Sequence, residues 1–564
     1  MPAWLKVVGR IAVLLLVALA GPAAVAQSPQ PARPNIVVIM FDDLSPRLGV
    51  AGDPLARTPN LDAFAAEAIR YPNTFVTGPV CAPSRSALMT GVHQQTLGSM
   101  HMRTRGAASL PGGGPIDYDA VPPPEVKAFP ELLRRAGYYT INVGKFDYQF
   151  GTPFTMWDAS GPGTDWRKRP DGRPFLAFIN LPRTHESYIW PEEATSANPL
   201  AQTIAARNKR DLAGKPRLTD PAKVVVPPYL PDTPVVRADL ARLYDNLAFE
   251  EAEVGRIMAA LRADGIADDT VVIVSSDHGD GLPRMKRSIY NDGLRVPFLV
   301  RLPGGGGAGE VREELVSFVD LAPTILALAG APVPRWIQGR PVLGPDARKN
   351  TLVFASADRF DEQPERRKTA IDGRYQYVRN YRPELAELRP LAFRDQMPTM
   401  QELWRLRAAG QLAPAAAKAF EPYGKTEELY DLRADPRTVR DLAGDPRHRR
   451  ELTRLRRGLD AWVRRTGDLS ALPELAVIER MWPGLKQPVT AAPVVRIQPV
   501  PEGSSVVLAS ATPGASIGYR LDPAAGWSLY TGPVRVPSGR TLEAKAVRYG
   551  YGESTVTRAQ APHG

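Results

Sequence analysis

Hydrophobic residues in the first part of the chain alternate between unbroken runs and helical spacings. Asn35–Phe41 reads Asn-Ile-Val-Val-Ile-Met-Phe, a run typical of a strand buried on both faces of a parallel sheet. Thr58 and Pro59 then offer an N-cap and a first-turn proline for a helix. The apolar positions that share one face of this helix are Leu61, Phe64, Ala65, Ala68 and Ile69. The pattern predicts a strand followed by a packed helix.

The same alternation continues to about residue 345. A helix is predicted over residues 129–136, with Gly137 as its stop, and a long helix over residues 239–264. Further strands are predicted over residues 138–143, 175–180, 271–275 and 296–300. Strands that alternate with helices indicate an α/β domain over residues 35–345, with a central, mostly parallel sheet and helices on both faces.

Two smaller regions follow this domain. Residues 346–480 combine short strand-like pieces with arginine-rich helices, which predicts an α+β subdomain; one helix starts at Asp445-Pro446 and stops at Gly467. Residues 494–560 contain short β-type runs separated by turn signals, which predicts a terminal β-sandwich. Sugar binding and a plain spacer role are both open for this last region.

The N-terminus has the pattern of a secretory signal peptide. Lys6 and Arg10 precede an apolar run over residues 11–20, and small residues at 24–26 provide a cleavage site. The run is shorter than the roughly 20 residues that span a membrane, although an uncleaved anchor is the alternative. Residues 1–26 therefore predict a periplasmic or secreted protein with no stable membrane insertion after cleavage.

Composition narrows the class of protein. Apolar residues make up 43% of the 564 positions and charged residues 23%, which is typical of a folded domain, and 57 prolines predict long irregular connections. The formal net charge of +11 favours encounters with polyanions, although an arginine-rich surface that keeps the protein soluble is the simpler interpretation. No nucleic-acid-binding motif is recognisable, so a nucleic-acid partner is not expected.

Cys81 is the single cysteine of a chain with an export signal. Exported proteins use cysteines mainly in disulfides, so a lone thiol indicates a chemical role. Residues 81–85 read Cys-Ala-Pro-Ser-Arg, which fits the CxPxR pattern of the type I sulfatases. The chain thus resembles this branch of the alkaline phosphatase superfamily. The resemblance implies an alkaline-phosphatase-like fold and a partner maturase that converts Cys81 to formylglycine.

Two acidic motifs follow predicted core strands. Asp42 and Asp43 come directly after the first strand, and Asp277 and His278 follow the strand over residues 271–275. Adjacent carboxylates repel unless a cation bridges them, although a solvated turn would explain the aspartate pair taken alone. The resemblance implies that these four residues and residue 81 bind one divalent cation, calcium in this family.

Several basic residues match sulfatase positions. The resemblance implies that Arg85, Lys145 and Lys286 act in the site, the two lysines by donating to sulfate oxygens. His185 is the candidate for protonating the leaving group, with a structural capping role as the alternative, and a pocket-lining role is expected for His101. Many sulfatases have a histidine two residues after the first lysine. This chain has Asp147 there, which either replaces that histidine or leaves its role absent.

The resemblance covers roughly residues 34–470 and is closest to the heparan N-sulfatase-like enzymes and other sulfatases of sulfated glycans. It implies hydrolysis of a sulfate ester or N-sulfate of a sulfated carbohydrate. A formylglycine hydrate suits this reaction because one hydroxyl attacks sulfur and the other later expels sulfate. The alternatives are a phosphonate or phosphate monoester hydrolase of the same superfamily and a non-catalytic glycan-binding protein.

Overall fold

The computed structural model of the protein describes residues 33–109, 113–170, 172–194 and 198–562. The predicted signal peptide, residues 1–26, lies outside the described residues. Within these ranges, none of the helices combines the length and apolar character that a membrane crossing requires.

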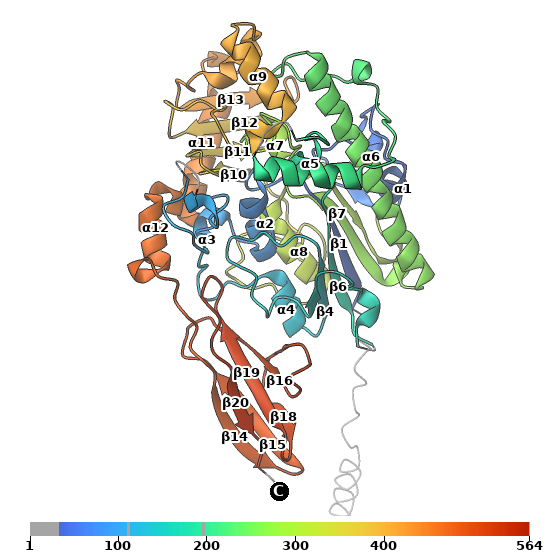
Figure 1. Ribbon diagram of the computed structural model, residues 1–564, viewed down its shortest axis with the longest axis vertical. Coiled ribbons are helices and arrows are strands. Elements are labelled where there is room, and N and C mark those ends of the chain that lie inside the picture. Colours follow the sequence, from blue (N-terminus) through green and yellow to red (C-terminus); the bar gives the residue numbers. More distant parts are fainter. Residues whose placement is uncertain (1–32, 110–112, 171, 195–197, 563–564) are drawn as a thin grey trace, which may run out of the picture. The chain divides into compact units, whose positions relative to one another are not determined.

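A seven-stranded sheet forms the centre of the large domain (Figure 1). Its middle strand β1 (Asn35–Phe41) pairs in parallel with β6 (Phe175–Leu181) on one side and β7 (Thr270–Ser276) on the other. Phe41 lies opposite both Leu181 and Ser276, so the three strands end at the same level. The strand order is β2 (Ile69–Arg70), β8 (Phe298–Arg301), β7, β1, β6, β4 (Tyr139–Val143) and β5 (Ala159–Ser160).

Helices cover both faces of this sheet, as the unbroken apolar run predicts. One face of β1 packs with residues of α2 (Cys81–Thr90), α4 (Phe129–Arg135) and α8 (Leu321–Leu328). The other face packs with α1 (Pro59–Ala66) and α6 (Pro234–Ala263). All seven residues of β1 are buried. The sheet and its two helix layers therefore give the strand ends a fixed frame.

Two helix boundaries differ from the sequence predictions, and the direction of one strand was not predicted. Helix α1 ends at Ala66, and Ile69 opens the edge strand β2. Helix α6 begins at Pro234, five residues before the predicted start, because Thr233 caps it with its side chain, which accepts from the Val236 amide. Strand β8 runs antiparallel to β7. Local sequence signals do not report strand direction, which depends on how the connection crosses the sheet.

A four-stranded antiparallel sheet follows in the chain. The amphipathic helix α11 (Arg449–Thr466) packs its leucine stripe and Trp462 against it, and Gly467 ends the helix at a φ of 71°. The strands are β10 (Val353–Ala357), β11 (Arg367–Ile371), β12 (Tyr375–Asn380) and β13 (Glu427–Asp431). The remaining short elements are α3 (Gln94–Leu97), α5 (Pro199–Asp211), α7 (Asn291–Leu294), α9 (Pro398–Ala408), α10 (Pro414–Ala417), α12 (Glu474–Met481), β3 (Thr74–Phe75) and β9 (Val316–Ser317).

Residues 494–560, here called the β-module, form two antiparallel sheets around one apolar core. Three of the seven strands, β17, β18 and β20, are two to four residues long and gave no sequence signal. One sheet contains β14 (Val494–Val500), β15 (Gly503–Ala509) and β18 (Val534–Pro537). The other contains β17 (Ser528–Leu529), β16 (Ser516–Arg520), β19 (Thr541–Val547) and β20 (Thr557–Gln560).

The β-module meets α4 through a buried carboxylate, and this contact is here called the junction. Glu131 is 0% exposed. It accepts hydrogen bonds from the hydroxyls of Ser516 (2.5 Å), Thr155 (2.7 Å) and Tyr549 (3.0 Å), and Arg135 lies 3.2 Å away. A Cβ on Gly514, which has a positive φ, would lie 2.2 Å from the Pro124 carbonyl oxygen. The two backbones therefore meet where only glycine fits.

Candidate active site

The predicted site residues converge at the carboxyl ends of the parallel strands. Asp42 and Asp43 follow β1, and Asp277 and His278 follow β7. Lys145 follows β4 and His185 follows β6. Open α/β sheets place ligands at this edge. The topology thus brings together residues that are far apart in the chain, such as Lys286 and Asp43, which are separated by 243 positions.

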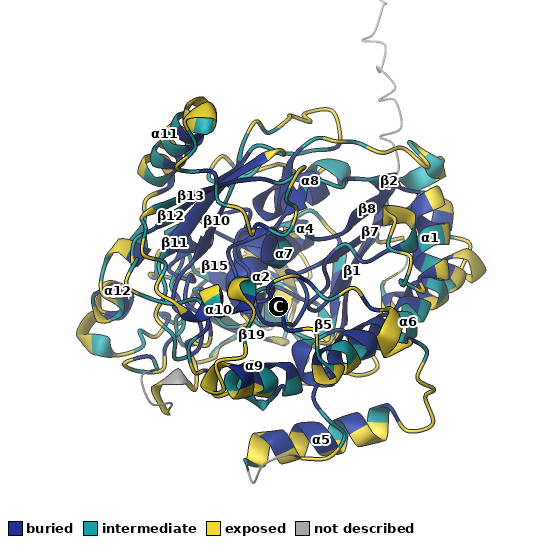
Figure 2. Ribbon diagram, turned by 90° about the horizontal axis from the view of Figure 1, so that it is seen from above, coloured by how far each residue is buried: buried dark blue, intermediate teal, exposed yellow. Residues whose placement is uncertain are grey.

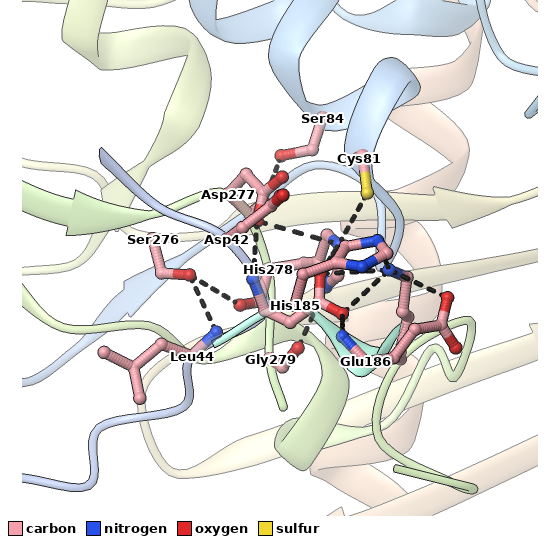
Figure 3. Close-up of polar contacts among 12 residues, drawn as sticks. Asp42, Leu44, Cys81, Ser84, His185, Glu186, Ser276, Asp277, His278 and Gly279 are labelled. Carbon is pink, nitrogen blue, oxygen red and sulfur yellow. Dashed lines mark hydrogen bonds and ion pairs between the residues drawn. The ribbon is translucent and has the colours of Figure 1, made fainter. Parts of the chain in front are cut away.

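Helix α2 delivers Cys81 into this group of residues. Cys81 is the first residue of the helix and is 1% exposed, and its sulfur lies 3.2 Å from His278 Nε2 (Figure 3). All ten residues of α2 are buried. Because the helix starts at Cys81 itself, Arg85 lies on its second turn. The N-terminus of α2 also favours negative charge beside residue 81.

Arg85 ties three strand ends together. Its guanidinium donates to Asp277 Oδ2 (2.8 Å), Asn180 Oδ1 (2.6 Å) and Asp42 Oδ1 (3.2 Å). Arg85 is 1% exposed, and such a charge is stable in the interior only when it is paired. The side chain therefore orients two of the carboxylates rather than reaching solvent.

Four side chains offer ligand atoms that all lie within 4.8 Å of one another: Asp43, Cys81, Asp277 and His278. All four are buried. Asp42, which the resemblance placed among the ligands, is not in this set, because its carboxylate binds Lys145 Nζ (2.9 Å) and Arg85.

Charge balance in this cluster fits a shared cation. Burial raises the pKa of Asp277 to about 7, although His278 and Arg85 favour its ionised form. Burial opposes a charge on His278 as well, yet Asp277 and Asp43 raise the pKa of this imidazole well above its ordinary value. Burial therefore outweighs the stabilisation that His278 and Arg85 give to the ionised Asp277 carboxylate. Two carboxylates, an imidazole and an oxygen at position 81 form a donor set that suits a hard divalent cation.

Cys81 itself lies in a positive field. Burial would raise the pKa of its thiol, but Lys145, Lys286 and His278 hold that pKa well below the ordinary value. A group that carries or develops negative charge at this position is thus stabilised.

Two glycines allow the loop after β7 to pack this tightly. A Cβ on Gly279 would lie 1.9 Å from the Asp292 carbonyl oxygen. A Cβ on Gly281 would lie 2.6 Å from the Glu186 Cα and 2.8 Å from Asp43 Oδ2. The motif Asp-His-Gly-Asp-Gly therefore needs its glycines for close approach of chain segments, not for a left-handed turn.

The two predicted lysines flank the carboxylates. Lys286 Nζ lies 2.8 Å from Asp43 Oδ2, 3.0 Å from Glu186 Oε1 and 3.1 Å from His185 Nε2. Lys145 Nζ lies 3.4 Å from Asp147 and contacts Asp42 as described above. Each lysine therefore has an acidic partner and also faces the same cavity.

That cavity is an open cleft of about 570 Å³. His185 is half-buried at its wall, where the Ser187 amide donates to its Nδ1 (3.2 Å) and the Ser187 hydroxyl lies 2.8 Å from the same atom. The residues that line the cleft include Asp42, Cys81, Lys145, Asp147, His185 and Lys286. Their common exposure to one cleft brings the candidate nucleophile, the cations and the candidate proton donor to one substrate.

His101 is not among the lining residues. Its Nδ1 accepts from the Arg359 amide at 3.2 Å, and its neighbours Met102 and Arg103 reach the cleft instead. The predicted pocket-lining role of His101 thus has no support in the geometry. Asp147 does line the cleft, at a φ of 56°.

Sequence reasoning gave no role to several residues that complete the site. Glu186 is buried, forms two 2.9 Å hydrogen bonds with Arg287, and donates its amide to Asp43 Oδ2. Asn180, at the end of β6, binds Arg85. Asn180 lies in the predicted strand that precedes His185, and Glu186 directly follows His185. Their position near the end of this strand was the sequence signal that could have identified them. Non-glycine residues with a positive φ also gather here, namely Asp43, Arg103, Asp147, Gln149 and Arg287, and such backbone strain clusters at functional sites.

Comparisons with known proteins agree with this geometry. The chain matches the family described as Sulfatase over residues 34–331. An ulvan-active sulfatase of Formosa agariphila is 38% identical over 543 residues, covering 92% of this chain and 90% of the relative. Homo sapiens N-sulphoglucosamine sulphohydrolase is 28% identical over 477 residues, covering 78% of this chain and 91% of the relative. A solved 2-O GAG sulfatase has a TM-score of 0.56 at 19% identity, covering 78% of this chain and 94% of that structure. The fold class predicted from the sequence is confirmed.

Proposed function

Because this chain belongs to the sulfatase family and is a sulfuric ester hydrolase, we propose that it removes sulfate from a sulfated carbohydrate, using formylglycine at position 81 and a bound calcium ion. The observation that carries the proposal is the position of Cys81. The chain's one cysteine lies in a buried cluster with Asp43, Asp277 and His278, at the base of a cleft that two lysines share.

A formylglycine hydrate at position 81 would supply two hydroxyls, one to attack sulfur and the other to expel sulfate afterwards. Calcium bound by Asp43, Asp277, His278 and residue 81 would favour ionisation of an oxygen at that position. Asp42 lies beside this set and supports it through its contact with Arg85. The donor set agrees with calcium because most of its atoms are oxygens once residue 81 is converted.

The remaining residues act on the substrate. Lys145 and Lys286 donate to the sulfate oxygens and stabilise the charge that develops in the transition state. His185 Nε2 gives a proton to the leaving oxygen or nitrogen, while Ser187 holds the ring through Nδ1. Asp147 accepts a hydrogen bond from residue 81 in place of the histidine that many sulfatases have.

The substrate class rests on relatives whose names specify ulvan and N-sulphoglucosamine. Both are sulfated carbohydrates, and sulfate ester and N-sulfate cleavage are therefore both to be tested. An exported location and a formylglycine-generating maturase remain part of the proposal. The mature protein would act outside the cytoplasm, on glycan, without a nucleic-acid partner.

Mass spectrometry of the native protein tests the proposal directly. The peptide containing residue 81 should have the mass of formylglycine, and the protein should turn over an aryl sulfate faster than the matching aryl phosphate or aryl phosphonate. An intact thiol in fully active protein would contradict the mechanism. Dominant phosphonate turnover would instead favour the phosphonate monoester hydrolase alternative.

A further inference from the structure

Helix α5 forms one wall of the cleft. Leu200, Ile204 and Arg207 lie one turn apart on this helix, and all three line the cleft that contains Cys81 and His185. Figure 2 shows the alternation of buried and exposed positions along α5, whose buried positions include Ile204 and Asn208. A wall that consists of one amphipathic helix presents a fixed row of side chains to the substrate.

Arg207 differs from the other cations of the cleft. Lys145, Lys286 and Arg287 have carboxylates within 3.0 Å, and Arg103 and Arg105 are paired with Asp361 and Asp119. Among the residues that the structure describes, no carboxylate lies within 4.0 Å of the Arg207 guanidinium. Burial lowers the pKa of Arg207, so its half-buried charge is less well compensated than that of its neighbours.

The Arg207 side chain is nevertheless held in place. Its Nη2 donates to Ser187 Oγ (2.9 Å) and to Asn208 Oδ1 (2.8 Å), and its guanidinium carbon lies 3.7 Å from the centre of the Tyr188 ring. Asn208 is 0% exposed and donates to the carbonyl oxygens of Ser187 and Trp190. Neutral acceptors and an aromatic face fix the direction of the guanidinium without cancelling its charge.

The position of Arg207 relates it to the leaving group. The Ser187 hydroxyl contacts both Arg207 Nη2 and His185 Nδ1, so the two side chains are separated by a single hydroxyl. His185 is the proposed proton donor to the leaving group. Arg207 therefore lies beside the part of the cleft that the desulfated sugar occupies, next to the apolar surface of Leu200 and Phe393.

We propose that Arg207 binds a second anionic group on the leaving saccharide, and that this contact selects substrates with two negative charges over singly sulfated ones. The inference rests on the proposed function and deepens it by specifying the substrate. The second group is a carboxylate or another sulfate, since both accept charge-assisted hydrogen bonds from a guanidinium. The Ser187 and Asn208 contacts use Nε and Nη2 of the guanidinium, which leaves Nη1 to donate to this group.

Steady-state kinetics of Arg207→Gln tests this role. The substrates are three saccharides with the same scissile sulfate, carrying no further charge, a uronate carboxylate or a second sulfate. For the doubly charged substrate that the enzyme prefers, KM should rise roughly tenfold, the effect of one lost charge-assisted contact. The rise should be smaller for the singly charged substrate, and Arg207→Lys should restore part of the difference. Whichever of the two doubly charged substrates shows the larger rise in KM identifies the second group as a carboxylate or a sulfate.

Two variants separate binding from indirect effects. Arg210→Gln is the matched control, because Arg210 lies on the same helix with its side chain 75% exposed and paired with Asp211, and it should leave all three KM values unchanged. Ser187→Ala removes the hydroxyl shared with His185 and should lower kcat on all substrates. An equal KM rise on all three substrates in Arg207→Gln, or a kcat loss that copies Ser187→Ala, would overturn the inference. If the wild-type enzyme cleaves none of the sulfated substrates, the proposed function itself fails.

Discussion

The candidate active site and the junction both bury negative charge, but they treat it differently. At the junction, Glu131 receives three hydroxyl hydrogen bonds and a guanidinium, and it is 0% exposed. At the site, Asp43 and Asp277 lie beside an imidazole and basic side chains, and their neighbour Cys81 lines an open cleft. At the junction the carboxylate is satisfied entirely by neighbouring protein groups, whereas at the site basic side chains line an open cavity.

The difference shows which property marks a functional site. Burial of an ionisable group is common to both regions, so burial alone does not distinguish them. An unmatched charge beside an accessible cavity does, because structural networks satisfy their groups internally. Substitutions at the site should therefore change catalysis, and substitutions at the junction should change stability.

Cys81→Ala should have the largest effect. It removes the proposed nucleophile, so kcat for an aryl sulfate should fall by on the order of 10^6-fold, as for loss of other catalytic nucleophiles. The change removes only the terminal atoms of one buried side chain, so the thermal midpoint should move by only a few degrees. Stopped assays and calorimetry on the same preparation measure both. A large loss of stability would contradict the expectation that substitutions at the site change catalysis rather than stability.

His185→Gln should have the second-largest effect on catalysis. Loss of general acid catalysis should lower kcat by roughly 10²- to 10⁴-fold on sugar substrates, and by less on an aryl sulfate whose leaving group needs no proton. The matched control is His448→Gln, at a histidine beside Tyr375 that directly precedes α11 in the α+β subdomain. The same loss on both substrate types would argue that His185 has a structural role.

Glu131→Ala should change stability rather than catalysis. The hydroxyls of Ser516, Thr155 and Tyr549 would lose their acceptor, which should cost about 3 kcal/mol of unfolding free energy. Urea unfolding measures the loss, with the exposed Glu125→Ala as control. The kcat of the folded variant should stay within a factor of about two, since ΔΔG values at distant sites are independent. Equal stability of both variants would show that the junction contributes little.

Acid should weaken the junction by a smaller amount. Burial would raise the pKa of Glu131, but Lys127, Arg135 and the hydroxyl donors hold it below its ordinary value. The ionised form thus stabilises the fold above that ordinary value, and the contribution is lost as pH falls through the lowered pKa. Glu131→Gln cannot titrate. The stability difference between wild type and this variant should therefore shrink as unfolding is measured from pH 6 down to pH 3.

The central sheet was predictable because its strands are buried on both faces. A run such as Ile36 to Phe41 has few alternatives to a core strand, and the polar residues that follow it then mark the ligand edge of the sheet. Strand direction in β8 and the short strands β17, β18 and β20 were not predictable. These features depend on long-range pairing, which a local pattern does not encode.

The site was predictable in its residues but less so in its contacts. Cys81, Asp43, Asp277 and His278 do gather, because strand ends and one helix start meet at one edge. Asp42 turns instead toward Lys145, and His101 turns toward the Arg359 amide. Neighbours in sequence point in different directions once the backbone turns, as at Asp43 with its φ of 56°. Arg207 carried no motif, and only the folded cleft gives it a role.

The burial of Cys81 has a consequence for the order of events during synthesis. His278, which covers the thiol, is translated 197 residues after it. Once β7 has joined the sheet, the Cys81 side chain is only 1% exposed, so a modifying enzyme would have little access to it. If residue 81 is converted as proposed, the maturase would act after this residue has left the ribosome and before His278 has joined it in the fold. A chain that folds ahead of its maturase would be trapped as an inert thiol.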